Sequence, residues 1–160
     1  MQEMVKFLRK DKSVIKIESA PLAIMSRYKQ IERSDKEAGG ILLGRMIENS
    51  NDVIIDEVTI PCPHDKRSRF SFFRSKNTQK TINSRWRTSQ QTQNYLGEWH
   101  THPEAHPSPS DTDVRNWQNI MTKGIFDQDF LFFVIVGQIT VSAWELRKDD
   151  AMLFQLRQID

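Results

Sequence analysis

The sequence predicts an α/β (α+β sandwich) fold in which a mixed β-sheet is flanked by helices. Two observations predict it. Segments with strand-like alternation are interspersed with segments whose apolar residues recur at helical spacing. The chain has 160 residues, 38% of them apolar, which is enough for one buried core and too short to suggest two. Residues 1–160 are therefore expected to form a single domain.

In the first half of the chain, strand-like segments surround one helix. The expected elements are, in order, a strand at Ser13–Glu18, a helix at Pro21–Lys36, and strands at Ile41–Ile47, Val53–Ile60 and Lys66–Lys76. Apolar residues at helical spacing favour the helix, which Ser19 is available to cap and which Gly39 and Gly40 are expected to end. The two central strands predict a hairpin, because the turn-forming residues 48–52 join them.

The segment Lys66–Lys76 combines several cations with aromatic residues. They are Lys66, Arg67, Arg69, Arg74 and Lys76, together with Phe70, Phe72 and Phe73. Two interpretations stay open. One is a solvated edge strand with its aromatic residues in the core, and the other is a surface that binds a partner.

In the second half of the chain, two helices alternate with three strands. The expected elements are a helix at Thr78–Gln93, a strand at Tyr95–His102, a helix at Ser110–Lys123, and hairpin strands at Phe130–Val136 and Ile139–Leu146. Gly137 and Gln138 supply the hairpin turn. For Leu153–Ile159 the pattern fits either a helix or a strand, and the two stay open.

Composition bounds the class of protein. Lys and Arg number 23 against 21 Asp and Glu, a net charge of +2, which argues against a dedicated nucleic-acid binder, and no specific nucleic-acid partner is expected. No apolar run approaches the roughly 18 residues of a membrane span, so no membrane partner is expected. The amino-terminal residues lack the apolar stretch of a secretory signal, and Cys62 is the single cysteine. These features predict a cytoplasmic protein.

His100 and His102 are the first candidates for chemistry. Residues two apart on a strand point to the same side, so both imidazoles can face one ion. The proline-rich loop after them cannot continue the strand, and a helix starting near Ser110 would place Asp113 in its first turn. If the loop folds back, Asp113 becomes a third ligand.

Simpler interpretations exist for each piece of this pattern. A His-x-His pair is often a polar surface face, and Ser110-x-x-Asp113 is also a helix capping box, which would itself fix the direction of the carboxylate. With Cys62 as the single thiol, a thiolate-rich structural zinc site is excluded. Two imidazoles, one carboxylate and an open fourth position are typical of catalytic zinc, which lowers the pKa of its bound water to about 7.

The whole pattern resembles a known family. His-x-His-Pro, the seven residues 103–109 and Ser-x-x-Asp together look like the JAMM motif of MPN+ metalloproteases, and the resemblance covers roughly Pro21 to Leu146. It implies the MPN/JAB (cytidine-deaminase-like) fold. It also implies one Zn²⁺ ion held by His100, His102 and Asp113, with the Ser110 hydroxyl helping to hold the zinc water and the oxyanion. Thr101 stands where serine is frequent, which changes none of these roles.

The general base has two candidates. Glu98 lies two residues before His100 and shares its strand face, so the residues alone leave it open beside Glu37. The resemblance favours Glu37, because in this family the upstream glutamate stands at the start of a strand, and Glu37 is followed by the strand-like run Gly39–Gly44. The implied mechanism is attack of water on a peptide or isopeptide carbonyl, with Glu37 moving the proton to the departing amine. Cys62 should be dispensable.

The resemblance also implies a substrate class. JAMM proteases typically cut after the C-terminus of ubiquitin or a ubiquitin-like protein joined to a lysine amine. This chain is similar to the bacterial JAB proteins, in particular the deconjugating isopeptidases of CBASS antiphage defence. The expected partner is therefore the C-terminal tail of a conjugated protein, either ubiquitin-like or a cGAS-like nucleotidyltransferase. The alternatives are an inactive MPN scaffold and a metallohydrolase that processes a ubiquitin-like or sulfur-carrier precursor.

Overall fold

A nine-stranded mixed sheet forms the centre of the computed structural model, which describes residues 3–76 and 78–160. Across the sheet the order is β10-β9-β8-β7-β3-β4-β2-β1-β11. The strands are β1 Val5–Leu8, β2 Val14–Ile17, β3 Gly39–Met46, β4 Val53–Val58, β7 Asn94–Thr101, β8 Phe130–Val136, β9 Val141–Arg147, β10 Asp150–Gln155 and β11 Arg157–Ile159. The β2–β4 and β7–β8 pairs are parallel and the rest antiparallel, which confirms the predicted mixed sheet.

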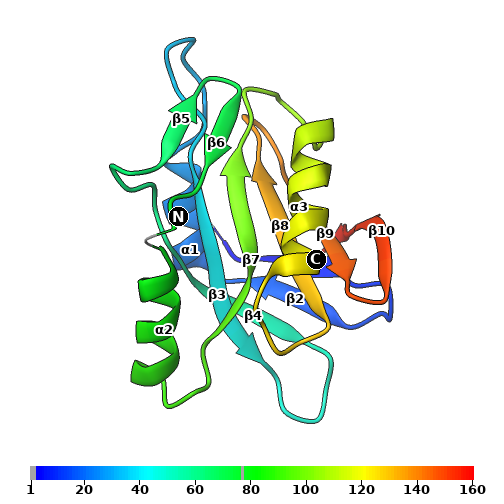
Figure 1. Cartoon of the computed structure of the whole chain (residues 1–160). Helices are drawn as coiled ribbons and strands as arrows, with labels where there is room; N and C mark the ends of the chain where they lie inside the picture. Colours follow the sequence, from blue (N-terminus) through cyan, green and yellow to red (C-terminus); the bar gives the residue numbers. More distant parts are fainter. Residues whose placement is uncertain (1–2, 77) are drawn as a thin grey trace.

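Helices cover both faces of the sheet (Figure 1). Helix α1, Ser19–Ser26, buries Leu22 and Met25 against one face, and helix α3, Asp111–Lys123, buries Trp117 against the other. Helix α2, Thr78–Thr88, lies to the side and buries none of its residues. Because β8 is covered on both faces, it is an almost continuous apolar run rather than an alternating one.

The sheet coils until its two edges come close together. Strands β10 and β11 are the outermost strands on opposite edges, yet Leu156 alone separates them in the chain. Across this closure the Arg9 guanidinium donates two hydrogen bonds to the Glu145 carboxylate, both 2.9 Å long. Both side chains are almost completely buried, and the guanidinium also lies over the ring of Phe130. This ion pair joins the end of β1 to β9.

A bulge in β7 decides which way the following residues face. Leu42 pairs with Gly97 whereas Leu43 pairs with Tyr95, which leaves Leu96 as an extra residue in β7. Gly97 has φ of 139°, and a Cβ there would overlap the carbonyl oxygen of Phe132. After the bulge, Trp99 joins Leu96 in the core on the α1 side. The residues that alternate with Trp99 therefore face α3.

The helix predicted at Pro21–Lys36 is wrong in length. Helix α1 begins at Ser19 and ends at Ser26, its N-cap is Glu18 without a side-chain hydrogen bond, and residues 27–38 form a loop. Gly39 and Gly40 start β3 instead of ending a helix. The loop persists because Gln30 is fully buried and its side chain bonds to distant backbone, tertiary contacts that outweigh helical spacing.

The single strand predicted at Lys66–Lys76 is also wrong. This segment instead folds back on itself as two short strands, β5 Lys66–Ser68 and β6 Ser71–Phe73, in a separate antiparallel sheet. Its aromatic residues do not enter the core, since Phe70 is 76% exposed and Phe73 is 50% exposed. We call residues 66–73 the β5–β6 hairpin.

Most of the remaining helices and strands lie where the sequence predicts them. Helix α3 and strands β2, β3, β4, β7, β8 and β9 lie within about two residues of their predicted bounds, whereas α2 begins at Thr78 as predicted but ends at Thr88 instead of Gln93. The segment left open between helix and strand is strand, in β10 and β11. Strand β1 was not predicted, because four residues carry too little periodicity to identify a strand.

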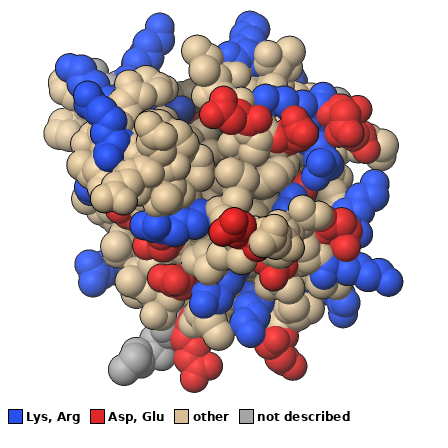
Figure 2. Space-filling model, turned by 90° about the horizontal axis from the view of Figure 1, so that it is seen from below, with Lys and Arg blue, Asp and Glu red and all other residues tan. Residues whose placement is uncertain are grey.

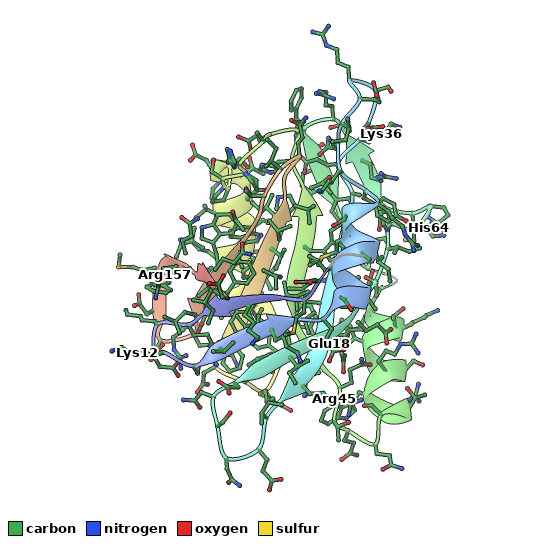
Figure 3. All side chains as sticks on the ribbon, turned by 180° about the vertical axis from the view of Figure 1, so that it is seen from behind. Lys12, Glu18, Lys36, Arg45, His64 and Arg157 are labelled. Atoms are coloured by element: carbon green, nitrogen blue, oxygen red, sulfur yellow. The ribbon has the colours of Figure 1, made fainter. Side chains whose placement is uncertain are left out.

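The surface carries both signs of charge. On the face shown in Figure 2, Lys and Arg side chains lie beside Asp and Glu, as the small net charge leads one to expect. His64 lies in a loop at the edge of the molecule in Figure 3. Among the described residues, no helix is long and apolar enough to cross a membrane.

Replacing Glu145 by Ala should lower the free energy of unfolding by about 3–5 kcal/mol, because Arg9 would remain buried without its carboxylate. The control is Arg85→Ala, which removes an exposed pair with Glu57 and should cost less than about 1 kcal/mol. Urea unfolding of both variants measures the difference. Equal, small losses would show that the buried pair contributes little.

Candidate metal centre

Strand β7 presents two imidazoles to the same side. His100 and His102 alternate with Thr101, and both face the α3 side of the sheet. Their Nε2 atoms lie 3.0 Å apart and their ring centroids 4.8 Å apart. Each side chain is about nine-tenths buried. The two nitrogens that the strand spacing predicts to converge do lie together.

Helix α3 brings a carboxylate to the same point. The Asp113 Oδ2 atom lies 3.3 Å from His100 Nε2 and 3.1 Å from His102 Nε2. Ser110 is the N-cap of this helix, its Oγ accepts from the Asp113 amide at 3.1 Å, and its own amide donates to Asp113 Oδ2 at 2.9 Å. The capping box therefore aims the carboxylate at the imidazoles, so the two sequence interpretations describe one geometry.

The three donor atoms fit a divalent metal ion. They form a nearly equilateral triangle with sides of 3.0, 3.1 and 3.3 Å. Tetrahedral zinc with bonds of about 2.0–2.1 Å places its ligand atoms about 3.4 Å apart, so small outward shifts would admit the ion. Two imidazoles and a carboxylate are also ligands that zinc accepts.

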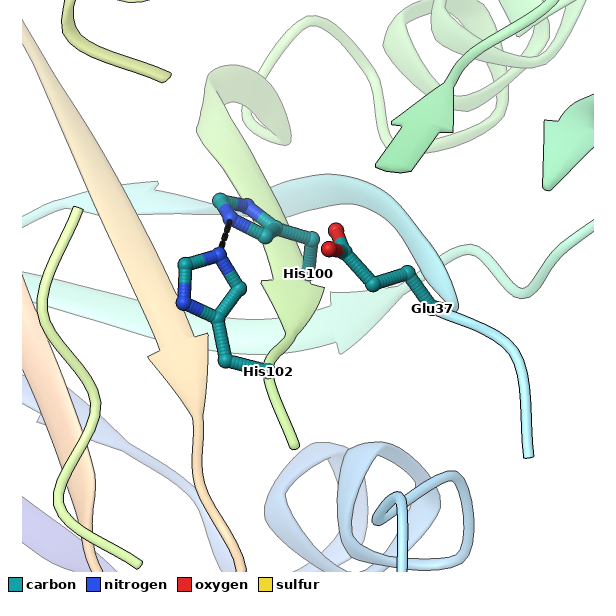
Figure 4. Close-up of side chains that lie close together, drawn as sticks. All are labelled: Glu37, His100 and His102. Atoms are coloured by element: carbon teal, nitrogen blue, oxygen red, sulfur yellow. Dashed lines mark hydrogen bonds between the residues drawn. The ribbon is translucent and has the colours of Figure 1, made fainter. Parts of the chain in front are cut away.

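Glu37 approaches the cluster from the neighbouring strand. It lies two residues before β3 begins at Gly39, and it is 4% exposed. A carboxylate oxygen of Glu37 and one nitrogen of each imidazole all lie within 4.8 Å of one another, and Figure 4 shows the carboxylate facing the two rings. At this distance Glu37 can reach a water molecule held at the cluster or, after a small movement, the cluster itself.

The backbone around Glu37 is fixed on two sides. The Glu37 amide donates to Ser68 O at 2.7 Å, and the Arg67 Nε donates to Glu37 O at 2.8 Å. On the other side, the Ala38 amide donates to Thr101 Oγ1 at 3.0 Å and the Thr101 amide donates to Ala38 O at 2.9 Å. Glu37 is therefore held between the β5–β6 hairpin and the strand that carries both histidines.

Gln30 braces this arrangement from beneath. Its Oε1 accepts from Thr101 Oγ1 at 2.8 Å, and its Nε2 donates to Arg69 O at 2.8 Å and to Asp35 O at 3.2 Å. Sequence reasoning missed Gln30 and gave Arg67 no role at this site, because no local pattern marks a glutamine bonded to Thr101 and Arg69 or an arginine bonded to Glu37.

Burial and charge shift the pKa values of three groups in the cluster. Burial raises the pKa of Glu37 to about 8, with the negative charges of Asp113 and Glu104 adding to the rise and His102 opposing it. Burial lowers the pKa of His102, but hydrogen bonds with Asp113 and Glu104 outweigh it and raise the pKa to about 9. For Asp113, burial opposes ionisation, yet hydrogen bonds from both imidazoles hold its pKa well below the usual range. The raised pKa values favour the protonated forms of Glu37 and His102 at neutral pH.

Glu98 is engaged elsewhere. Its carboxylate accepts from Arg74 Nε at 3.0 Å, from Arg74 Nη2 at 3.3 Å and from the Tyr95 hydroxyl at 2.9 Å. Three donors therefore occupy the oxygens of the rival base, whereas the carboxylate of Glu37 faces the imidazoles. The geometry favours Glu37 as the base.

Ser110, Cys62 and His106 each have a defined place in the structure. Ser110 is exposed, and its Oγ accepts one hydrogen bond, so its own proton remains free to donate. Cys62 lies in the loop before β5 and donates to Asp65 Oδ1 at 3.2 Å. His106 lies in a loop beside Thr140. None of the three lies among the converging ligand atoms.

A groove of about 220 Å³ leads up to the cluster. His100 and Asp113 line it together with β6, residues 74–76 and α3. Phe72 and Trp117 supply apolar walls, and Arg74 and Glu98 form a paired polar wall. The predicted Lys66–Lys76 segment thus contributes one side of this groove, through its second half.

Comparisons with known proteins agree on one family. Residues 20–147 match the family described as prokaryotic homologs of the JAB domain. A protein of Pseudomonas aeruginosa named "CD-NTase/cGAS isopeptidase" is 36% identical over 80% of each chain. Proteins of the same name from Escherichia coli, 30% identical over 79% of this chain and 78% of the relative, and Vibrio cholerae, 28% identical over 83% and 81%, are also similar.

A solved structure has a similar fold. The solution structure of a protein from Desulfitobacterium hafniense superposes with a TM-score of 0.62 and covers 88% of each chain. Its sequence is 20% identical to this one, so the likeness concerns the fold alone.

Loading zinc at pH 7 should release about one to two protons, because His102 and Glu37 hold protons that a cation displaces. Calorimetric titration in buffers of different ionisation enthalpy counts the protons. The Glu37→Gln variant is the control, since it cannot release the carboxyl proton and should release fewer. Zinc binding without proton release would contradict the coupled cluster.

Proposed function

Since the chain belongs to the family of prokaryotic JAB-domain homologs, we propose that it is a zinc-dependent isopeptidase. It would hydrolyse the bond between the C-terminus of one protein and a lysine amine of another. The observation that carries this proposal is the convergence of His100, His102 and Asp113, with the buried carboxylate of Glu37 facing the imidazoles. A JAB domain that served as a scaffold alone would not need four such groups at one point.

In this proposal, His100, His102 and Asp113 hold one zinc ion. When bound, zinc supplies Lewis-acid polarisation of the scissile carbonyl and acidifies a coordinated water. Glu37 accepts the proton from the attacking water, a task that suits a carboxylate whose pKa burial has already raised. The same carboxyl group then donates that proton to the departing lysine amine.

Ser110 supplies a hydrogen-bond donor. Its Oγ accepts from the Asp113 amide, which fixes the oxygen and leaves the hydroxyl proton to point toward the developing oxyanion. The Glu37 amide donates to Ser68 O, and the next residue, Ala38, exchanges two hydrogen bonds with Thr101, which keeps the base from moving with the substrate. Fixed donors and acceptors of this kind lower the reorganisation needed in the transition state.

The substrate proposal follows the names of the relatives. Three similar proteins are named "CD-NTase/cGAS isopeptidase". By extension, this chain would release a cGAS-like nucleotidyltransferase, or another ubiquitin-like conjugate, from its targets in CBASS antiphage defence. The C-terminal tail of that protein would lie in the groove between β6 and α3, where Phe72 and Trp117 offer apolar contacts.

The Glu37→Ala variant should retain zinc but lose turnover by about 10²–10⁴-fold, because the general base is gone while the three ligands remain. His102→Ala should lose both zinc and turnover. Metal analysis of each purified protein, together with cleavage of a peptide joined to a lysine ε-amine, measures the two effects. Loss of zinc from Glu37→Ala would make Glu37 a ligand, and an inactive Glu98→Ala beside an active Glu37→Ala would make Glu98 the base.

An isopeptide-linked peptide should be cleaved faster than the same peptide in a linear fusion, because the proposed leaving group is a lysine amine. The two substrates share their C-terminal tail, so kcat/KM for each isolates the bond type. Faster cleavage of the linear fusion would favour the alternative function, processing of a ubiquitin-like or sulfur-carrier precursor.

A further inference from the structure

Glu104 contacts the far side of a candidate zinc ligand. Its Oε1 lies 2.7 Å from His102 Nδ1, whereas His102 Nε2 faces His100 and Asp113. The two ring nitrogens of His102 therefore have different partners. Nε2 faces the other candidate ligands, and Nδ1 contacts the Glu104 carboxylate.

A carboxylate beside Nδ1 determines where the imidazole carries its hydrogen. An ionised carboxylate can only accept hydrogen bonds, so Nδ1 must donate. A neutral imidazole has one N–H, and placing it on Nδ1 leaves the Nε2 lone pair free for a metal ion. The same hydrogen bond fixes the rotation of the ring, so the lone pair points to the place where the three donor atoms converge.

The loop that carries Glu104 is tied to the β8–β9 turn. Gln138 donates its amide hydrogen to Glu104 O at 2.7 Å, and the amides of Ile139 and Thr140 both donate to Ala105 O at 3.1 Å. Gln138 also donates its side-chain amide to Gln30 O, which connects the turn to the brace beneath the site. The carboxylate is thus presented from a fixed backbone.

This contact is not an ordinary exposed ion pair, and Glu104 is not placed to act as a second general base. Glu104 is 46% exposed, but its partner His102 is 9% exposed, so the hydrogen bond lies at the edge of the buried site. A general base must reach water near the Nε2 atoms, and Glu104 lies on the opposite edge of the ring. Glu104 contacts Nδ1, the ring nitrogen of His102 that faces away from the cluster.

We propose that Glu104 is a positioning residue that holds His102 as an Nε2 ligand for zinc. The inference rests on the proposed zinc site and adds a residue outside the family motif. Carboxylates in this position behind a ligating histidine orient the ring and make it a stronger base, and their removal weakens metal binding by about 10–100-fold.

The experiment compares zinc affinity in three variants by competition with a chelator of known affinity. Glu104→Ala removes the hydrogen bond and should weaken zinc binding by about 10–100-fold. Glu104→Gln keeps a carbonyl oxygen that can accept from Nδ1 and should weaken binding by less than about tenfold. Asp111→Asn removes another exposed negative charge close to Asp113 and should change the affinity least.

Nitrogen-15 NMR of the zinc-loaded protein supplies a second readout. In the wild type and in Asp111→Asn, the Nδ1–H of His102 should be protected from exchange with water. In Glu104→Ala its signal should broaden or disappear, while thermal unfolding of the metal-free protein stays close to that of the wild type.

The outcomes separate this inference from the zinc proposal. If the wild-type protein binds no zinc, both the zinc proposal and the role of Glu104 are wrong. Zinc binding by the wild type with equal affinity in Glu104→Ala overturns the role of Glu104 alone. Equal losses in Glu104→Ala and Asp111→Asn overturn it as well, since net charge would then account for the effect.

Discussion

The register between β3 and β7 is the constraint on which the site depends. Gly39 pairs with His100, and reciprocal hydrogen bonds tie Ala38 to Thr101, so Glu37, the next residue back along the chain, must lie beside the histidine pair. Gly39 also allows the close approach, because a Cβ there would lie 2.5 Å from Trp99 O and 2.6 Å from Phe72 Cε1. A shift of this register by one residue would turn the Glu37 side chain away from the imidazoles.

Electrostatics links the proposed zinc site to the protonation of its side chains. Asp113, Glu37 and Glu104 place three carboxyl groups around two imidazoles, and most of these groups are shielded from water. Burial raises the pKa of Glu37, and, against burial, hydrogen bonds with Asp113 and Glu104 raise the pKa of His102, so both groups favour their protonated forms at neutral pH. A zinc ion would displace these protons, so metal binding, protonation and the readiness of the base are coupled.

The parts of the site that local rules govern could be predicted from sequence. The two-residue period of a strand places His100 beside His102, and helix capping aims Asp113, so both follow from short segments. Glu37 could not be separated from Glu98 by residues alone, since the choice depends on β3–β7 pairing and on Arg74 and Tyr95 occupying Glu98. The short α1, the β5–β6 hairpin and the brace at Gln30 escaped prediction for the same reason, because distant hydrogen bonds decide them.

X-ray absorption at the zinc edge tests the central claim most directly, because it reports the ligands of the bound ion. Zinc-loaded protein should show nitrogen and oxygen neighbours at about 2.0–2.1 Å, with the scattering of two imidazole rings and no sulfur. A sulfur neighbour at about 2.3 Å, a single imidazole, or a protein that takes up no zinc would contradict the account.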